Sequence, residues 1–183
     1  TASHHLSRLL DAGLVEVAAR GRHRYFRLAG PEVGELIEAV ARVAPAQPVT
    51  SLRQGTRAHA VRYARHCYDH LAGRLGVAVA EALDGQGFLR TDADASSYTV
   101  TSAGAARLAQ VGVDVHAGDT GRCCLDWTEQ RRHLAGPLGR ALLARCLELG
   151  WLAPSPKGRA LRLTEAGRTG FRERLAVELP SFD

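Results

Sequence analysis

The feature that most constrains the fold of this 183-residue chain is an internal repeat at a fixed offset of 63 residues. The segment His70-Leu-Ala-Gly-Arg-Leu-Gly76 recurs as His133-Leu-Ala-Gly-Pro-Leu-Gly139. At the same offset, Gly87-Phe-Leu89 recurs as Gly150-Trp-Leu152, and Thr101-Ser-Ala-Gly104 recurs as Thr164-Glu-Ala-Gly167. Two copies are too few for an open solenoid, so we expect them to form a closed module with pseudo-twofold symmetry.

Each copy has the same order of predicted elements. An apolar helix ends at a glycine (71–83 and 134–149), a short hairpin follows (88–100 and 151–163), and a threonine begins a second helix (102–111 and 165–179). Since a helix followed by a hairpin is typical of a winged helix, we interpret each copy as a winged-helix-like unit. This interpretation predicts an α+β chain, mainly α with small β-hairpin wings.

The first 28 residues have the same order of helix and hairpin. Leu6, Leu9 and Leu10 give one apolar stripe on a helix that Gly13 ends, and strand-like segments at 14–19 and 24–28 flank a turn at 20–23. In a winged helix-turn-helix, such a helix enters the major groove and the hairpin rests on phosphates or the minor groove. The candidate DNA-binding residues are Thr1, Ser3, His4 and Arg8 on the helix, and Arg20, Arg22, His23 and Arg24 on the hairpin. The alternative is that the arginine-rich hairpin is only a solvated turn.

This stretch contains an ordered set of motifs: Ser3-His-His-Leu6, Leu9, Ala12-Gly-Leu-Val15, Arg20-Gly-Arg22, Tyr25 and Leu28. Together they resemble the ArsR (arsenic-repressor) family of dimeric winged-helix regulators. The resemblance implies double-stranded operator DNA and a second copy of the chain as partners. That family has about three helices ahead of the recognition helix, so we expect the native chain to be longer at its N-terminus.

Residues 31–44 are predicted to form the next helix. Val33, Leu36, Ile37, Val40 and Val43 give it one apolar face. This face either packs within its own domain or, as the resemblance implies, lies in the dimer interface. Some members of the family carry paired Asp and His zinc ligands on this helix. Here the only acidic residues are glutamates and no histidine occurs, so that site is not expected.

These patterns divide the chain into three predicted parts. Residues 1–45 form a winged helix-turn-helix DNA-binding domain with the dimerisation helix. Residues 46–56 form a linker, because Pro45 and Pro48 break the helix. Residues 57–183 form a C-terminal domain of two winged-helix-like units, 57–119 and 120–183.

The composition limits the class of protein. The chain is 45% hydrophobic and 23% charged, with a net charge of +5, which suits globular domains and a polyanionic partner. No apolar run approaches the length of a membrane span, so no membrane partner is expected. The four cysteines lack the spacing of a disulfide framework, so we expect reduced thiols and a cytoplasmic protein.

The residues around each His-Leu-Ala-Gly segment carry the candidate chemistry of the C-terminal domain. Both copies contain Cys-x-Asp before the histidine, with six extra residues in the second copy. The candidate effector or metal residues are Cys67, Asp69, His70, Cys123, Cys124, Asp126 and His133. If the two units face each other, these side chains approach one another. Sulfur atoms about 4 Å apart with a histidine nearby would then indicate a ligand set.

Several interpretations of these residues remain open. They can be purely structural, or they can line a small-molecule pocket at the pseudo-dyad. Thiolate and imidazole also suit zinc or another transition metal, and the neighbouring arginines would favour a thiol sensor. Cys146 lies at helical spacing among leucines and is expected in the core. No cofactor is required by any motif.

The leading hypothesis is a DNA-binding transcriptional regulator, a dimeric repressor whose C-terminal domain binds an effector or stabilises the dimer. The alternative is a metal- or thiol-based sensor, or a metal-binding protein, that uses the Cys, Asp and His residues of the repeats. We do not expect an enzyme, because the sequence has no glycine-rich phosphate loop and no nucleophile elbow.

Overall fold

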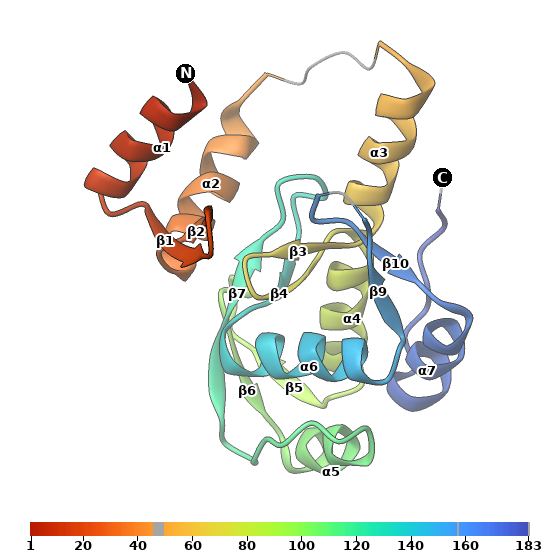
Figure 1. The fold of residues 1–183 in the computed structure, drawn as a ribbon. Coiled ribbons are helices and arrows are strands. Elements are labelled where there is room, and N and C mark those ends of the chain that lie inside the picture. Colours follow the sequence, from red (N-terminus) through yellow and green to blue (C-terminus); the bar gives the residue numbers. More distant parts are fainter. Residues whose placement is uncertain (46–49, 157, 183) are drawn as a thin grey trace. The chain divides into compact units, whose positions relative to one another are not determined.

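The chain forms two compact units, Thr1–Ala44 and Pro45–Asp183, called here the N-terminal and C-terminal units (Figure 1). The structure is a computed structural model and describes residues 1–45, 50–156 and 158–182. Residues 46–49, which belong to the expected linker, lie outside the described residues.

The N-terminal unit is a helix, a hairpin and a second helix. Helix α1 (Ala2–Asp11) leads through Gly13, at φ +69°, into the antiparallel strands β1 (Val15–Arg20) and β2 (His23–Leu28), and helix α2 (Pro31–Val43) follows. Arg20 pairs with His23, so a two-residue turn joins the strands. The element order and the position of the turn are confirmed for this stretch.

The N-terminal unit buries few side chains. Among its large apolar residues Val15 is buried, whereas several others are exposed. The exposed ones on α2 are Leu36, Ile37, Val40 and Val43, with Val43 82% exposed. Leu36, Val40 and Val43 follow helical i, i+4, i+7 spacing, so they form one uncovered apolar stripe.

The C-terminal unit begins with helix α3 (Leu52–Tyr63), inside the range for which the sequence favoured a linker. The first repeat then contains β3 (Arg65–Cys67), β4 (His70–Ala72), α4 (Arg74–Gly85), β5 (Leu89–Thr91), β6 (Ser97–Val100) and α5 (Ser102–Gln110). The second contains β7 (Thr120–Leu125), β8 (Arg132–Leu134), α6 (Gly136–Glu148), β9 (Leu152–Pro154), β10 (Leu161–Leu163) and α7 (Glu165–Leu175).

The start of the first helix in each repeat was predicted wrongly. His70–Ala72 and Arg132–Leu134 are strands, paired with β3 and β7 respectively. The backbone turns out of the strand direction at Gly73 and Gly136, which have φ of +82° and +68°. Helix α4 begins directly after Gly73, and α6 begins at Gly136. The last helix also ends at Leu175 and not at 179, because Ala176 adopts a left-handed conformation.

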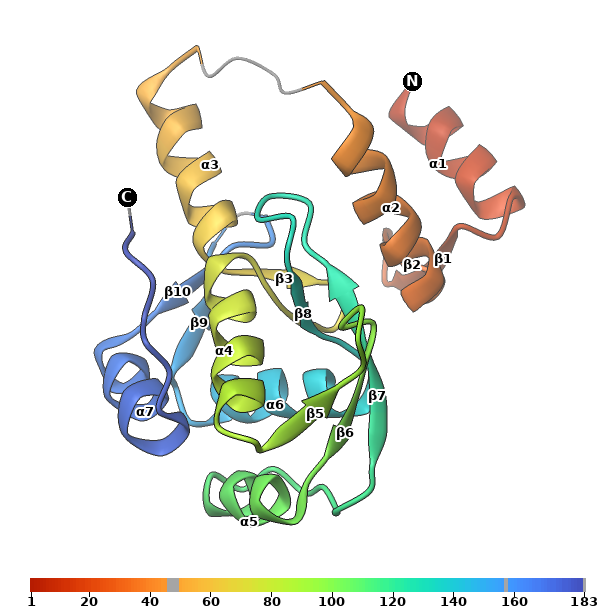
Figure 2. The same cartoon turned by 180° about the vertical axis from the view of Figure 1, so that it is seen from behind.

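The two repeats exchange strand pairings. Strand β6 of the first repeat pairs with β7 of the second, which gives a four-stranded sheet in the order β5-β6-β7-β8 (Figure 2). In the larger sheet, Ser97 of β6 pairs with Arg122 of β7. The equivalent positions in the opposite repeats are Ala160 and Arg65, and an isolated β-bridge between these two residues joins β3 to the β9–β10 hairpin. Each first hairpin therefore lies against the second hairpin of the other repeat.

The helices also cross between repeats. Helix α4 packs on β8, and α6 packs on β4. Glycines permit this approach, because a Cβ on Gly76 would lie 3.6 Å from the Cβ of His133, and one on Gly139 would lie 3.2 Å from the Cβ of His70. The same two Cβ atoms would also meet a carbonyl oxygen, that of Leu71 at 2.6 Å and that of Leu134 at 2.5 Å. The repeated glycines thus place each histidine against the helix of the other repeat.

One apolar core joins both repeats. It includes Leu75, Leu83 and Leu108 from the first repeat and Leu142, Phe171 and Leu175 from the second. Thr101 and Thr164 cap α5 and α7 by accepting hydrogen bonds from Gly104 N and Gly167 N, both at 3.0 Å. Among the described residues, no helix has the length and apolar character needed to cross a membrane.

Candidate nucleic-acid interface and buried Cys–His centre

All eight candidate DNA-binding residues are exposed on the N-terminal unit. Thr1 is the N-cap of α1, and Ser3, His4 and Arg8 lie on that helix. The other four surround the β1–β2 turn: Arg20 ends β1, Arg22 lies in the turn, and His23 and Arg24 begin β2. The residues are therefore available to a ligand on one unit of the chain.

The charge at the tip of this hairpin is not offset by carboxylates. The guanidinium groups of Arg20 and Arg24 lie 6.0 and 5.4 Å from the ring centres of Tyr25 and Phe26, and within the described residues neither they nor Arg22 form an ion pair. Farther along β2, Arg27 pairs with Glu16 at 2.6 Å. The uncompensated positive charge is thus concentrated at the turn, where phosphates would bind.

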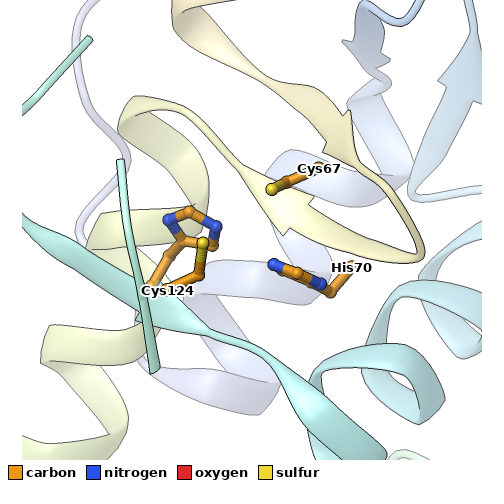
Figure 3. Close-up of side chains that lie close together, drawn as sticks. Cys67, His70 and Cys124 are labelled. Carbon is orange, nitrogen blue, oxygen red and sulfur yellow. The ribbon is translucent and has the colours of Figure 1, made fainter. Parts of the chain in front are cut away.

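The C-terminal unit contains a buried centre of two cysteines and two histidines. Cys67 and His70 come from the β3–β4 hairpin, and Cys124 and His133 come from β7 and β8. One nitrogen or sulfur atom from each residue lies within 4.8 Å of those of the other three, and all four residues are buried. The side chains of Cys67, His70 and Cys124 point toward one another (Figure 3). We call these four residues the Cys–His centre.

The other three candidate residues lie outside this group. Cys123 is half-buried beside it on β7, and its pKa is raised to about 11, chiefly by burial. Asp69 and Asp126 lie behind the histidines: Asp69 Oδ1 is 3.0 Å from Nδ1 of His70, and Asp126 Oδ2 is 3.5 Å from Nδ1 of His133. In each repeat, the cysteine of the Cys-x-Asp motif therefore belongs to the Cys–His centre, and the aspartate lies against the histidine ring.

The carboxylate of Asp126 is fully buried and contacts several polar partners. It accepts hydrogen bonds from Gly73 N at 2.7 Å and from the hydroxyl of Thr128 at 2.7 Å, and it pairs with the buried Arg65 at 3.0 Å. Burial alone would raise the pKa of Asp126, but these partners, above all Arg65, hold it at about 2. The carboxylate is thus charged at neutral pH and fixes the β7–β8 loop against the first repeat.

The thiols of the chain differ in their surroundings. The hydrogen bond with the Cys67 thiol lowers the pKa of Cys124 despite burial, and His133 and His70 lower it further. Burial in the core raises the pKa of Cys146 to about 12, and the expectation that Cys146 is a core residue is confirmed. A thiolate at Cys124 is the form in which cysteine binds metals and reacts with electrophiles.

The arrangement supplies two sulfur and two nitrogen donors, the combination found in tetrahedral zinc sites. The ring centres of His70 and His133 are 5.1 Å apart. In the described part of the chain, Nε2 of both histidines and Nδ1 of His133 have no oxygen or nitrogen hydrogen-bond partner. Buried polar atoms normally have such partners, so the two Nε2 atoms, which lie beside the Cys124 sulfur, are suited to bind a further ligand.

Sequence reasoning missed Arg65 and Arg140, which support the carboxylates. Arg65 pairs with Asp126, and Arg140 donates to Asp69 at 2.7 Å. For Arg65 a signal was present, because an arginine precedes each cysteine of the centre by two residues, as Arg65 and Arg122. Arg140 has no such pattern.

Comparisons with known proteins give the family. No family model matches the chain, and no solved structure matches it. The HTH-type transcriptional regulator YdfF of Bacillus subtilis (strain 168) is 42% identical over 184 residues, an alignment that covers 98% of this chain and 80% of the relative. The chain therefore belongs to the family of DNA-binding, HTH-type transcriptional regulators that includes this relative.

Proposed function

We propose that this regulator is a dimeric repressor with an ArsR-like winged helix, in which the N-terminal unit binds operator DNA and the C-terminal unit receives an effector. The observation that carries the proposal is the uncompensated basic turn between β1 and β2, next in sequence to an exposed helix. Such a pair supplies a helix for base edges and a hairpin for phosphates. The protein acts as a cytoplasmic regulator and not as an enzyme.

Dimer formation is supported by the apolar stripe on α2. Leu36, Val40 and Val43 are all more than half exposed, although each is a large apolar side chain. A second copy that packs the same stripe against it would remove this surface from water, and a twofold dimer presents two identical helices to a palindromic operator. An effector that favours one arrangement of the two copies then changes operator affinity through differential binding.

Fluorescence anisotropy with duplex fragments from promoter regions tests the DNA-binding surface. Arg22→Ala and Arg24→Ala should each reduce the slope of log affinity against log salt by about one, because each removes one phosphate contact. Arg27→Ala is the matched control on the same strand, since the charge of Arg27 is already offset by Glu16. If all three variants keep the wild-type salt slope, or if no fragment binds, the proposed interface is wrong.

A further inference from the structure

We propose that Cys67, His70, Cys124 and His133 bind one transition-metal ion of the zinc class, with two ligands contributed by each repeat. All four donors lie in the C-terminal unit, so metal binding is independent of the proposed DNA binding. Only its regulatory effect rests on the proposed function.

The distances are compatible with tetrahedral coordination. Bonds of about 2.3 Å to sulfur and about 2.0–2.1 Å to nitrogen place the ligand atoms of a tetrahedral zinc site about 3.3–3.8 Å apart. The four donor atoms already lie within 4.8 Å of one another. Side-chain shifts of about 1 Å would therefore complete the site, without a change in the strands that carry the ligands.

Both histidines are held in the orientation that a metal requires. Asp69 Oδ1 lies within hydrogen-bond distance of Nδ1 of His70, at 3.0 Å, and Asp126 Oδ2 lies 3.5 Å from Nδ1 of His133, an ion-pair contact without hydrogen-bond geometry. The carboxylates therefore lie on the Nδ1 side of both rings and leave Nε2 for the metal ion. Carboxylates in this position are the usual outer partners of metal-bound histidines. Arg140 and Arg65 fix these two carboxylates in turn. A purely structural pair of neighbouring rings would not need this support on both sides.

The donor set also suits the charge balance of a buried site. Two thiolates offset the two charges of a zinc ion, so the filled centre adds no net charge to the interior. All four coordination positions are taken by protein atoms, as in structural and sensing sites rather than in catalytic ones. Because β4 and β8 belong to different repeats, the bound ion would link the two repeats to each other.

Zinc titration of the metal-free full chain, under reducing conditions and in competition with a chromophoric chelator, tests the site. We expect one zinc ion per chain, and we expect Cys124→Ser to lower zinc affinity by more than about 100-fold, beyond the effect typical of outer partners. Cys123→Ser is the matched control, because Cys123 is the adjacent thiol outside the centre. A folded wild-type chain that binds no zinc overturns the proposal, as do equal zinc affinities of the two variants.

A second variant distinguishes the loss of a zinc ligand from unfolding of the chain. Asp69→Ala leaves all four ligands in place and removes a half-buried carboxylate near the surface. It should lower zinc affinity by about 10–100-fold while the circular dichroism spectrum remains that of the wild type. Unchanged zinc affinity in this folded variant would contradict the orienting role of Asp69 and, with it, the proposed coordination through Nε2.

The regulatory effect is measured separately. Operator affinity of the same preparations should change by at least about fivefold when zinc is added, the lower limit of common allosteric coupling. Equal operator affinity with and without zinc would remove the regulatory role, although the zinc site would stand. Absence of DNA binding in both states would instead refute the proposed function.

Discussion

The two repeats of the C-terminal unit each place an aspartate at Nδ1 of their histidine, but in different surroundings. In the first repeat, Asp69 lies in the short β3–β4 turn, and its partner Arg140 is largely exposed. In the second, six additional residues form a loop around Asp126, which is completely buried with Arg65. A carboxylate beside Nδ1 is common to both repeats, at 3.0 Å in the first and 3.5 Å in the second, whereas only the carboxylate of the second is completely buried.

This difference separates two roles of the repeated aspartate. What both copies share is the orientation of a ring, which a ligand at Nε2 requires. What only Asp126 does is bind Gly73 N and the Thr128 hydroxyl, which joins the inserted loop to the start of α4 in the other repeat. The first role concerns binding and the second concerns stability, so the two aspartates should respond differently to the same substitution.

The largest expected difference is in the free energy of unfolding of Asp126→Ala and Asp69→Ala. Removal of Asp126 leaves the buried Arg65 without its carboxylate and should cost about 3–5 kcal/mol. Removal of Asp69 affects a pair with a mostly exposed arginine and the contact to Nδ1 of the buried His70, and should cost about 1–2 kcal/mol. Urea denaturation of the two variants measures this difference. Similar losses in both would show that the two repeats do not differ as described.

A smaller loss of stability is expected at two glycines that occupy the same position in both repeats, Gly104 and Gly167. A Cβ at Gly104 would overlap the carbonyl oxygen of Phe88, and one at Gly167 would overlap that of Trp151. Substitution of either glycine by alanine should therefore destabilise the chain by about 1–3 kcal/mol. Gly85, at the end of α4, is the control, since a Cβ there would meet no atom within 4 Å.

Thermal unfolding of the three alanine variants measures their differences in stability. Gly85→Ala should be neutral, or stabilising by up to about 1 kcal/mol, because alanine loses less entropy than glycine in a helix. If Gly104→Ala or Gly167→Ala behaved like Gly85→Ala, close backbone approach would not be the reason that both copies carry glycine there.

The sequence predicted local features well and long-range pairing poorly. The threonine before each last helix and the glycine that ends α1 are local signals, and the structure uses them as expected. The segments His70–Ala72 and Arg132–Leu134 are only three residues long, so helical and strand periods cannot be told apart in them. Their pairing with β3 and β7, and the exchange of hairpins between repeats, depend on contacts far apart in the chain.

For the candidate centre, the repeat itself was the useful signal. It indicated that Cys67 and His70 would meet Cys124 and His133 if the copies faced each other, and the structure brings these four together. It did not distinguish them from Asp69, Asp126 and Cys123. Cys123 differs from Cys124 because neighbouring residues of β7 point to opposite sides of the strand, and Asp69 and Asp126 lie in the turns that follow β3 and β7.

X-ray absorption spectroscopy of the zinc-loaded full chain tests the central claim most directly, that two repeats share one metal centre. The spectrum should show two sulfur neighbours at about 2.3 Å and two nitrogen neighbours at about 2.0–2.1 Å. One sulfur neighbour should be lost in Cys67→Ser or Cys124→Ser. A shell of oxygen and nitrogen atoms alone, or a sulfur contribution unchanged in both variants, would contradict it.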